Sequence, residues 1–120
     1  MNQHFVLGLT LCKEEKFEEA ITELNKSLLM NPDHKEALYN RGMAKFKLRK
    51  FLDAIQDFDK ALDIAPKDAN IYSQRGVAKH LMGKSELAMK DMDIAQLIEP
   101  QNAYRYTSRA FVRAKMGDLF

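Results

Sequence analysis

Small and apolar residues recur along this chain at the spacing of amphipathic helices. Between residues 53 and 64 they stand three or four positions apart, which places them on one face of a helix. This apolar stripe consists of Ala54, Phe58, Ala61 and Leu62. Pro66 ends the predicted helix, because proline has no N–H to donate and pushes the preceding residue out of the helical region. A first helix over roughly residues 36–48 precedes it.

The whole pattern returns with a period of 34 residues. The residues that keep this period are Pro32, Pro66 and Pro100, Gly8, Gly42 and Gly76, and Ala20, Ala54 and Ala88. A period of about 20–50 residues is typical of a solenoid, whose units bury their apolar faces only by stacking on each other. The sequence therefore predicts an all-α array over residues 1–120, with repeats 1–34, 35–68 and 69–102 and a half repeat 103–120.

The periodic glycines fall inside predicted helices, where glycine costs about 0.5–1 kcal/mol relative to alanine. Their recurrence at Gly8, Gly42 and Gly76 predicts that a second helix approaches each of them too closely for a side chain. Two antiparallel helices should therefore pack tightly within every repeat.

Both ends of the chain lack the polar outer faces that close a solenoid. The first predicted helix begins almost at Met1 without a cap, and the half repeat ends where its second helix should begin. Apolar side chains near this end are Phe111, Val112, Leu119 and Phe120. We therefore expect a segment of a longer protein, or a chain whose terminal helices associate with a second copy.

The register of the repeats closely resembles the tetratricopeptide repeat, a helix-turn-helix of 34 residues. That family favours an aromatic residue or Leu at position 4, Gly or Ala at 8, Ala at 20, an aromatic at 24, Ala at 27 and Pro at 32. The matching residues at positions 4, 24 and 27 are Leu38, Tyr72 and Tyr106, then Phe58, then Ala61 and Ala95. The resemblance implies a right-handed superhelix of about 3.5 repeats.

In this family the first helices of successive repeats line a concave groove that binds partner proteins. Carried over by position, the candidate groove residues are Phe5, Leu9, Tyr39, Asn40, Met43, Phe46, Asn70, Gln74, Val77, His80, Tyr104 and Phe111. Aromatic residues and methionines suit a partner helix or an extended apolar peptide, and the amides suit its backbone. The resemblance thus implies a protein-interaction scaffold that binds a partner peptide or helix. Alternatively, part of this set belongs to the core between repeats.

Chaperone-binding members of the family hold a peptide's terminal carboxylate with five side chains, which together are called a carboxylate clamp. The first repeat supplies Lys at position 5 and Asn at position 9, and the second repeat supplies Asn at position 6. The third repeat supplies Lys at position 2 and Arg at position 6. This chain has Phe5, Leu9, Asn40, Asn70 and Gln74 at those positions, so only Asn40 matches. We therefore expect a groove without a carboxylate clamp.

Arginine also keeps the period, at Arg41, Arg75 and Arg109, and acids recur at Glu23, Asp57 and Asp91. We expect each acid to meet the arginine of the following repeat, because arginine packs its stem on apolar surface while its fork reaches a carboxylate. The alternative is a basic stripe for phosphate or an acidic peptide, which these acids would neutralise.

Composition and motifs argue against catalysis. The three histidines occupy different repeat positions, Cys12 is a lone cysteine, and no spacing is typical of a metal site or phosphate loop. A net charge of +2 is too small to favour nucleic acid, and no apolar run is long enough for a membrane span. We therefore expect a cytoplasmic protein that is not an enzyme, needs no cofactor or metal, and binds neither nucleic acid nor membranes.

Overall fold

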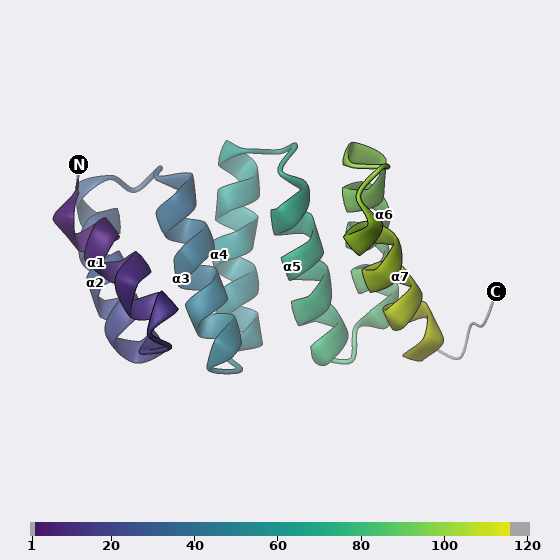
Figure 1. Cartoon of the computed structure of the whole chain (residues 1–120), viewed down its shortest axis with the longest axis horizontal. Coiled ribbons are helices and arrows are strands. Elements are labelled where there is room, and N and C mark those ends of the chain that lie inside the picture. The colour runs from purple at the N-terminus through teal and green to yellow at the C-terminus, as the bar shows by residue number, and fades with distance from the viewer. Residues whose placement is uncertain (1, 116–120) are drawn as a thin grey trace. The chain divides into compact units, whose positions relative to one another are not determined.

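A computed structural model describes residues 2–115, all of whose regular structure is helical (Figure 1). The helices are α1 (Gln3–Lys13), α2 (Phe17–Met30), α3 (Lys35–Lys47), α4 (Phe51–Ile64), α5 (Ala69–Leu81), α6 (Ser85–Ile98) and α7 (Ala103–Lys115). The side chains of residues 103–108 are not described. The predicted Leu119 and Phe120 lie outside the described residues.

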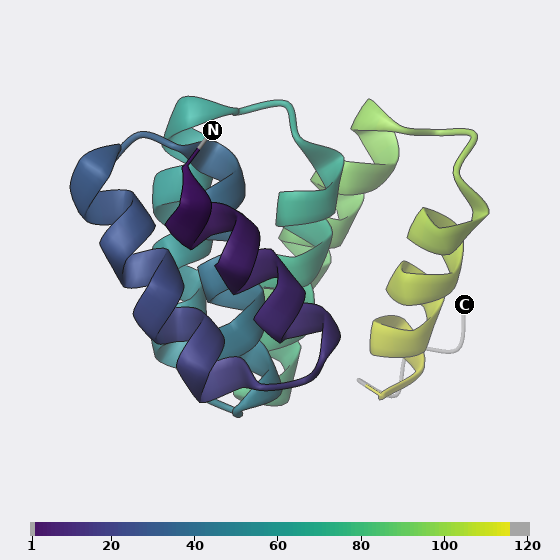
Figure 2. The same cartoon turned by 60° about the vertical axis from the view of Figure 1, so that its left-hand side comes forward.

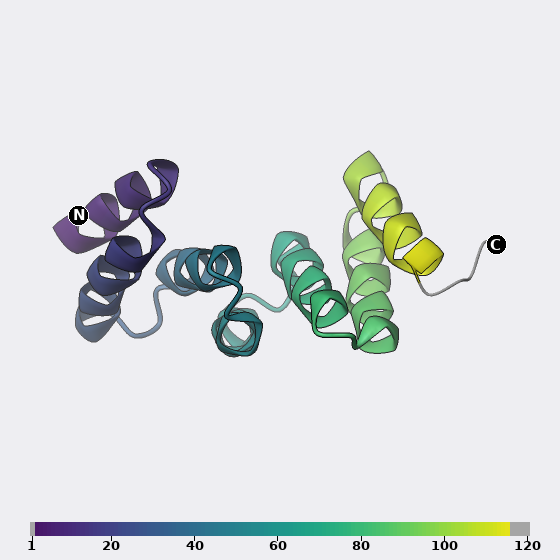
Figure 3. The same cartoon turned by 90° about the horizontal axis from the view of Figure 1, so that it is seen from below.

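The chain forms two compact units, Met1–Ala65 with α1–α4 and Pro66–Phe120 with α5–α7. In the first unit α1 packs on α2, α2 on α3 and α3 on α4, and α1 also contacts α3. Figure 2 shows α1 and α2 as an antiparallel hairpin. In the second unit α6 contacts both α5 and α7 (Figure 3). This arrangement confirms the predicted all-α helix-turn-helix repeat fold.

Local chemistry explains where several helices begin. The side-chain oxygen of Asn2 accepts hydrogen bonds from the backbone N–H groups of His4 and Phe5, and Asp68 caps α5 in the same way. The expectation of an uncapped first helix was therefore wrong, because Asn2 satisfies N–H groups that would otherwise lack a partner.

The turns inside the three helix pairs share a left-handed residue at one repeat position. Glu15 has φ 61°, Arg49 has φ 63° and Gly83 has φ 82°. Only glycine adopts this conformation without steric cost. The first two turns therefore store strain that the third avoids.

The periodic glycines sit where the helices of each pair touch, as the sequence predicts. A Cβ atom added to Gly42 would lie 2.7 Å from the Phe58 ring, and one added to Gly8 would lie 2.8 Å from the Leu24 side chain. Leu24 and Phe58 are completely buried. A bulky apolar side chain of the second helix thus fills the space above each glycine.

Candidate functional site

In the first unit, the candidate groove residues lie on α1 and α3. All six are half-buried: Phe5, Leu9, Tyr39, Asn40, Met43 and Phe46. Their aromatic rings make contacts inside the unit, because Phe5 lies 4.4 Å from the ring of His34 and Phe46 lies 5.4 Å from the ring of Phe51, centroid to centroid. These contacts fix the rings in place while part of each side chain stays open to solvent.

Tyr39 and Asn40 add polar groups to this face. The Tyr39 ring lies 5.9 Å from that of the buried Phe58. The Asn40 side-chain amide donates a hydrogen bond to the Glu36 carbonyl over 2.7 Å, which leaves its oxygen available to a backbone N–H. The face can therefore bury apolar side chains and bind a peptide backbone.

The second unit divides its candidates between core and surface. Val77 packs against the buried cluster of Ala88, Met92 and Val112, which assigns it largely to the core. Gln74 is half-buried and Asn70 is exposed. The alternative interpretation, in which part of the set belongs to the core, therefore describes Val77.

His80 and Phe111 form a second aromatic contact. Their ring centroids are 6.0 Å apart in an edge-to-face arrangement, and His80 Nδ1 lies 3.0 Å from Ser85 Oγ. Phe111 is 57% exposed, which makes it the most open aromatic side chain among the described candidates. Lys115 lies over this ring, 5.5 Å from its centroid. Tyr104 belongs to the part of α7 whose side chains are not described.

Arg41 and Arg75 pair with acids of their own repeats, so their predicted pairing with Glu23 and Asp57 of the preceding repeats was wrong. Arg109 does meet an acid of the preceding repeat, but this acid is Asp93 and not the predicted Asp91. Asp57 accepts from Arg41 Nε over 2.9 Å and from Arg41 Nη2 over 2.7 Å, and Lys45 Nζ lies 3.0 Å away. The same two-pronged contact joins Arg75 to Asp91. The reason is the hairpin, which brings residues 16 apart face to face on its two antiparallel helices.

The sequence pattern also does not predict that these acids are buried, because it places Asp57 on the polar face of its helix. Asp57 is only 4% exposed and Asp91 2%. Each buried carboxylate is held by two cations, the arginine and a lysine four residues later. Arginine at this position therefore stabilises the hairpin, which disfavours the alternative of a basic stripe for phosphate.

The first repeat replaces the arginine with Leu7, so Glu23 finds other partners. His4 Nδ1 lies 2.8 Å from Glu23 Oε1, and Lys26 donates to Oε2 over 3.2 Å. The hydrogen bond from His4, aided by that from Lys26, lowers the pKa of Glu23 against the opposing effect of desolvation.

The described residues contain no group of three or more His, Cys, Asp or Glu side chains that could hold a metal ion. Burial raises the pKa of the half-buried Cys12 thiol, which lowers its reactivity at neutral pH. None of the helices in this part of the chain is both long and apolar enough to cross a membrane.

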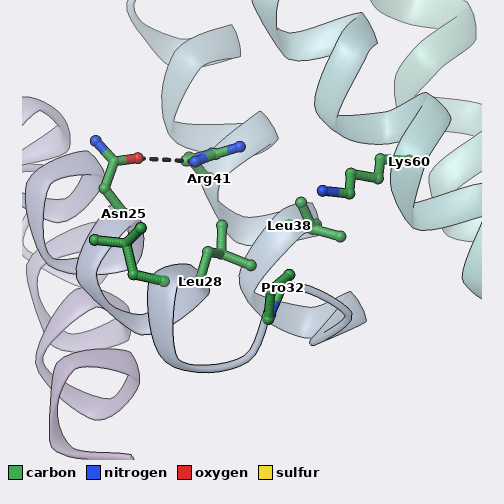
Figure 4. A pocket seen from close by; sticks show the side chains of 7 residues that line it. Asn25, Leu28, Pro32, Leu38, Arg41 and Lys60 are labelled. Atoms are coloured by element: carbon green, nitrogen blue, oxygen red, sulfur yellow. Dashed lines mark hydrogen bonds between the residues drawn. The ribbon is translucent and has the colours of Figure 1, made fainter.

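One pocket of the first unit escaped the sequence analysis. It lies among α2, α3 and α4 and has a volume of about 320 Å³ (Figure 4). Its apolar lining consists of Leu28, Leu29, Pro32 and Leu38, and its polar lining of Asn25, Arg41 and Lys60. A signal for it exists in the sequence, because Leu29 and Asn25 stand where the second repeat has Asp63 and Asp59.

Comparison with solved structures finds tetratricopeptide-repeat domains. The chain is 27% identical to the first such domain of Spaghetti (RPAP3) bound to the HSP90 peptide SRMEEVD, with a TM-score of 0.90 over 95% of this chain and 90% of that one. It is 25% identical to the second domain of human RPAP3 in complex with the HSP70 peptide SGPTIEEVD, with a TM-score of 0.87 and 92% of each chain covered. MamA shares the fold at 23% identity, with a TM-score of 0.92 over 98% of this chain and 71% of that one.

Comparison with curated proteins finds no match. The tetratricopeptide repeat family model, in contrast, matches residues 5–69, more than half of the chain. The matched region covers α1 from Phe5 onward and all of α2, α3 and α4, with the glycines and buried apolar residues where these helices pack. Repeat period, helix packing and family match agree, and the chain belongs to the tetratricopeptide repeat family.

Proposed function

We propose that this protein is a non-catalytic interaction scaffold, cytoplasmic as the sequence suggests, that binds a partner peptide or helix on the faces of its first helices. The observation that supports this most directly is the likeness to two peptide-bound domains at 25–27% identity over almost the whole chain. The faces of α1 and α3 offer half-buried aromatic and methionine side chains with an amide oxygen among them.

Binding energy on this face comes from apolar burial rather than from charge. Tyr39 and Phe46 are the anchors, because each ring is already held by a neighbouring ring and loses little freedom when a ligand covers it. Asn40 bonds the ligand backbone. In the second unit, Gln74, His80 and Phe111 are the candidates with amide and aromatic side chains, and Tyr104 is a further candidate.

We further propose that ligand recognition does not use a carboxylate clamp. Phe5 and Leu9 stand where the clamp needs a lysine and an asparagine, and both are apolar and half-buried. A terminal carboxylate placed there would lose hydration without gaining a cation. The ligand therefore binds through internal residues, and amidation of its C-terminus leaves the affinity within about threefold.

Selection of peptides from a random library, followed by titration of the best binder, tests the proposal. Replacement of Tyr39 and Phe46 by alanine should weaken binding at least tenfold, because the ligand then covers no aromatic ring at either position, and full burial of one large apolar side chain is worth about 1.5–3 kcal/mol. Leu52→Ala is the matched control, because Leu52 is exposed on α4, outside the first-helix face. Circular dichroism must show that each variant is still folded at the assay temperature. Equal affinity of all three proteins would place the site elsewhere.

A second candidate function is self-association through the terminal helices. The observation that favours it is α7, where Phe111, Ala110 and Ala114 are all exposed. An exposed aromatic beside small residues suits close packing of a second helix. Sedimentation over a hundredfold range of concentration tests this candidate, with Phe111→Glu expected to abolish any association. A constant monomer mass at all concentrations would exclude it.

A further inference from the structure

The pocket among α2, α3 and α4 is lined by none of the candidate groove residues on the first helices. We propose that it binds a peptide segment of a partner protein in which an aliphatic side chain stands beside a carboxylate. Figure 4 shows the lining: apolar side chains of α2, α3 and the turn between them, with Asn25 and Arg41 at one side and Lys60 reaching in from α4.

The apolar half of the pocket is built around one unusually open side chain. Leu29 is 84% exposed, although it lies beside Leu28 and Leu38, which are buried. Pro32 adds a rigid apolar wall. An aliphatic side chain bound here would cover Leu29 and pack against the buried Leu28 and Leu38. Burial of apolar surface is the main source of binding energy in such sites.

The polar half of the pocket carries excess positive charge. Arg41 Nη1 donates to the neutral side-chain oxygen of Asn25 over 2.9 Å. At the same repeat positions in the second unit, Arg109 Nη1 instead meets the carboxylate of Asp93 at 3.2 Å. At this repeat position Arg41 therefore has a neutral amide as its partner, whereas Arg109 has a carboxylate.

Other charges around the pocket do not restore neutrality. Arg41 and Lys45 share the single carboxylate of Asp57. Lys60 adds a further cation, and none of the described residues forms an ion pair with it. Asp33 and Asp59 adjoin lining residues in the sequence, and Asp63 follows Lys60 by three residues. All three are exposed and do not line the pocket. A carboxylate on the ligand is therefore the complementary group.

Comparison of the first two repeats shows that the pocket's combination of an apolar side chain and a neutral amide on the second helix occurs in α2 but not in α4. In α4 the positions equivalent to Asn25 and Leu29 are Asp59 and Asp63, which would repel a carboxylate and offer no apolar cover. Packing residues keep the 34-residue period, whereas these two positions break it. The volume of about 320 Å³ lies at the lower end of about 300–1,000 Å³ for ligand sites, and fits one or two side chains rather than a whole helix.

The test uses NMR amide spectra of the full chain, labelled with ¹⁵N, and the blocked peptide acetyl-Ala-Leu-Glu-Leu-Ala-amide. Saturable shifts should appear in the last turns of α2 and the first turns of α3. Two control peptides separate the contributions: Gln in place of Glu should weaken binding about threefold or more, and Ser in place of both Leu residues about fivefold or more.

The chain supplies a matched pair of protein variants. Leu29→Ser should weaken binding about fivefold, whereas Leu97→Ser, at the same position of the third repeat and 80% exposed, should have no effect. Lys60→Gln should weaken binding about threefold. Lys90→Gln is its control and should leave the affinity unchanged, because Lys90 is exposed on α6 and does not line the pocket. Because Leu29 is so exposed, its replacement leaves stability nearly unchanged.

Three results would overturn the proposal. One is the absence of saturable shifts at the pocket up to the solubility limit of the peptide. Another is equal affinity for the Glu and Gln peptides, which would remove the carboxylate from recognition. The third is concentration-dependent self-association that Leu29→Ser abolishes, since the occupant would then be a second copy of this chain. The Tyr39 and Phe46 variants should keep the pocket's affinity, which distinguishes this site from the first-helix face.

Discussion

Replacement of Asp57 by asparagine tests the energetic role of the buried ion pairs. The substitution keeps the shape of the side chain and removes its charge. Asp57 is almost fully buried and holds both Arg41 and Lys45 at 2.7–3.0 Å. Asparagine would leave these two cations facing a neutral amide whose NH₂ group is itself a donor.

The expected cost follows from the burial of the three groups. Breaking a fully buried ion pair costs about 3–5 kcal/mol. Here the cations keep contact with water, because the side chains of Arg41 and Lys45 are 21% and 19% exposed. Solvent screening therefore reduces the cost of Asp57→Asn to about 2–3 kcal/mol.

Urea unfolding followed by circular dichroism measures this cost. With a slope of about 1–3 kcal/mol per molar urea, a cost of about 2–3 kcal/mol should lower the midpoint by roughly 0.7–3 M. Asp91→Asn should behave alike, because Asp91 makes the same contacts with Arg75 and Lys79. Asp63→Asn is the control, since Asp63 is exposed on the same helix as Asp57. A midpoint for Asp57→Asn equal to that of the control would refute the reasoning.

Three further predictions concern the packing, the turns and the pH dependence of stability. Gly42→Ala should destabilise the chain by about 1–2 kcal/mol in urea unfolding, because overlap with the Phe58 ring outweighs the gain in helix propensity. Glu15→Gly should stabilise it by about 1 kcal/mol in the same assay, since glycine relieves the strain at φ 61°. The advantage of the wild-type protein over Glu23→Gln should persist at neutral pH and disappear as the pH falls below about 4.3, because a lowered pKa stabilises the folded state only while the group is ionised. Unfolding midpoints of both proteins between pH 7 and pH 3 check this.

The repeat period predicted the fold because it records packing. Gly42 and Phe58 keep their positions since one fills the space that the other leaves, and a pattern of apolar spacing captures that relation. The partners of Arg41 were harder to predict, because two carboxylates lay at suitable repeat positions. Only the hairpin geometry shows that the acid of the same repeat comes within hydrogen-bond distance.

The burial of the candidate groove residues was harder to predict from the sequence than the fold. Family positions identify which residues lie on the first helices, but not how deeply each one is buried. Val77 belongs largely to a core cluster, whereas Phe111 is well exposed, although both occupy the same repeat position. The pocket around Leu29 depends on three helices at once, so the sequence shows that Leu29 and Asn25 differ from Asp63 and Asp59 of the second repeat, but not that a pocket forms there.

Mapping a library-selected peptide onto the full chain by NMR tests the central claim most directly. The account predicts amide shifts on the exposed sides of α1 and α3, centred on Tyr39, Asn40 and Met43, with affinity unchanged within about threefold when the peptide's C-terminus is amidated. Shifts that avoid these helices, or an affinity that depends on a free terminal carboxylate, would contradict it.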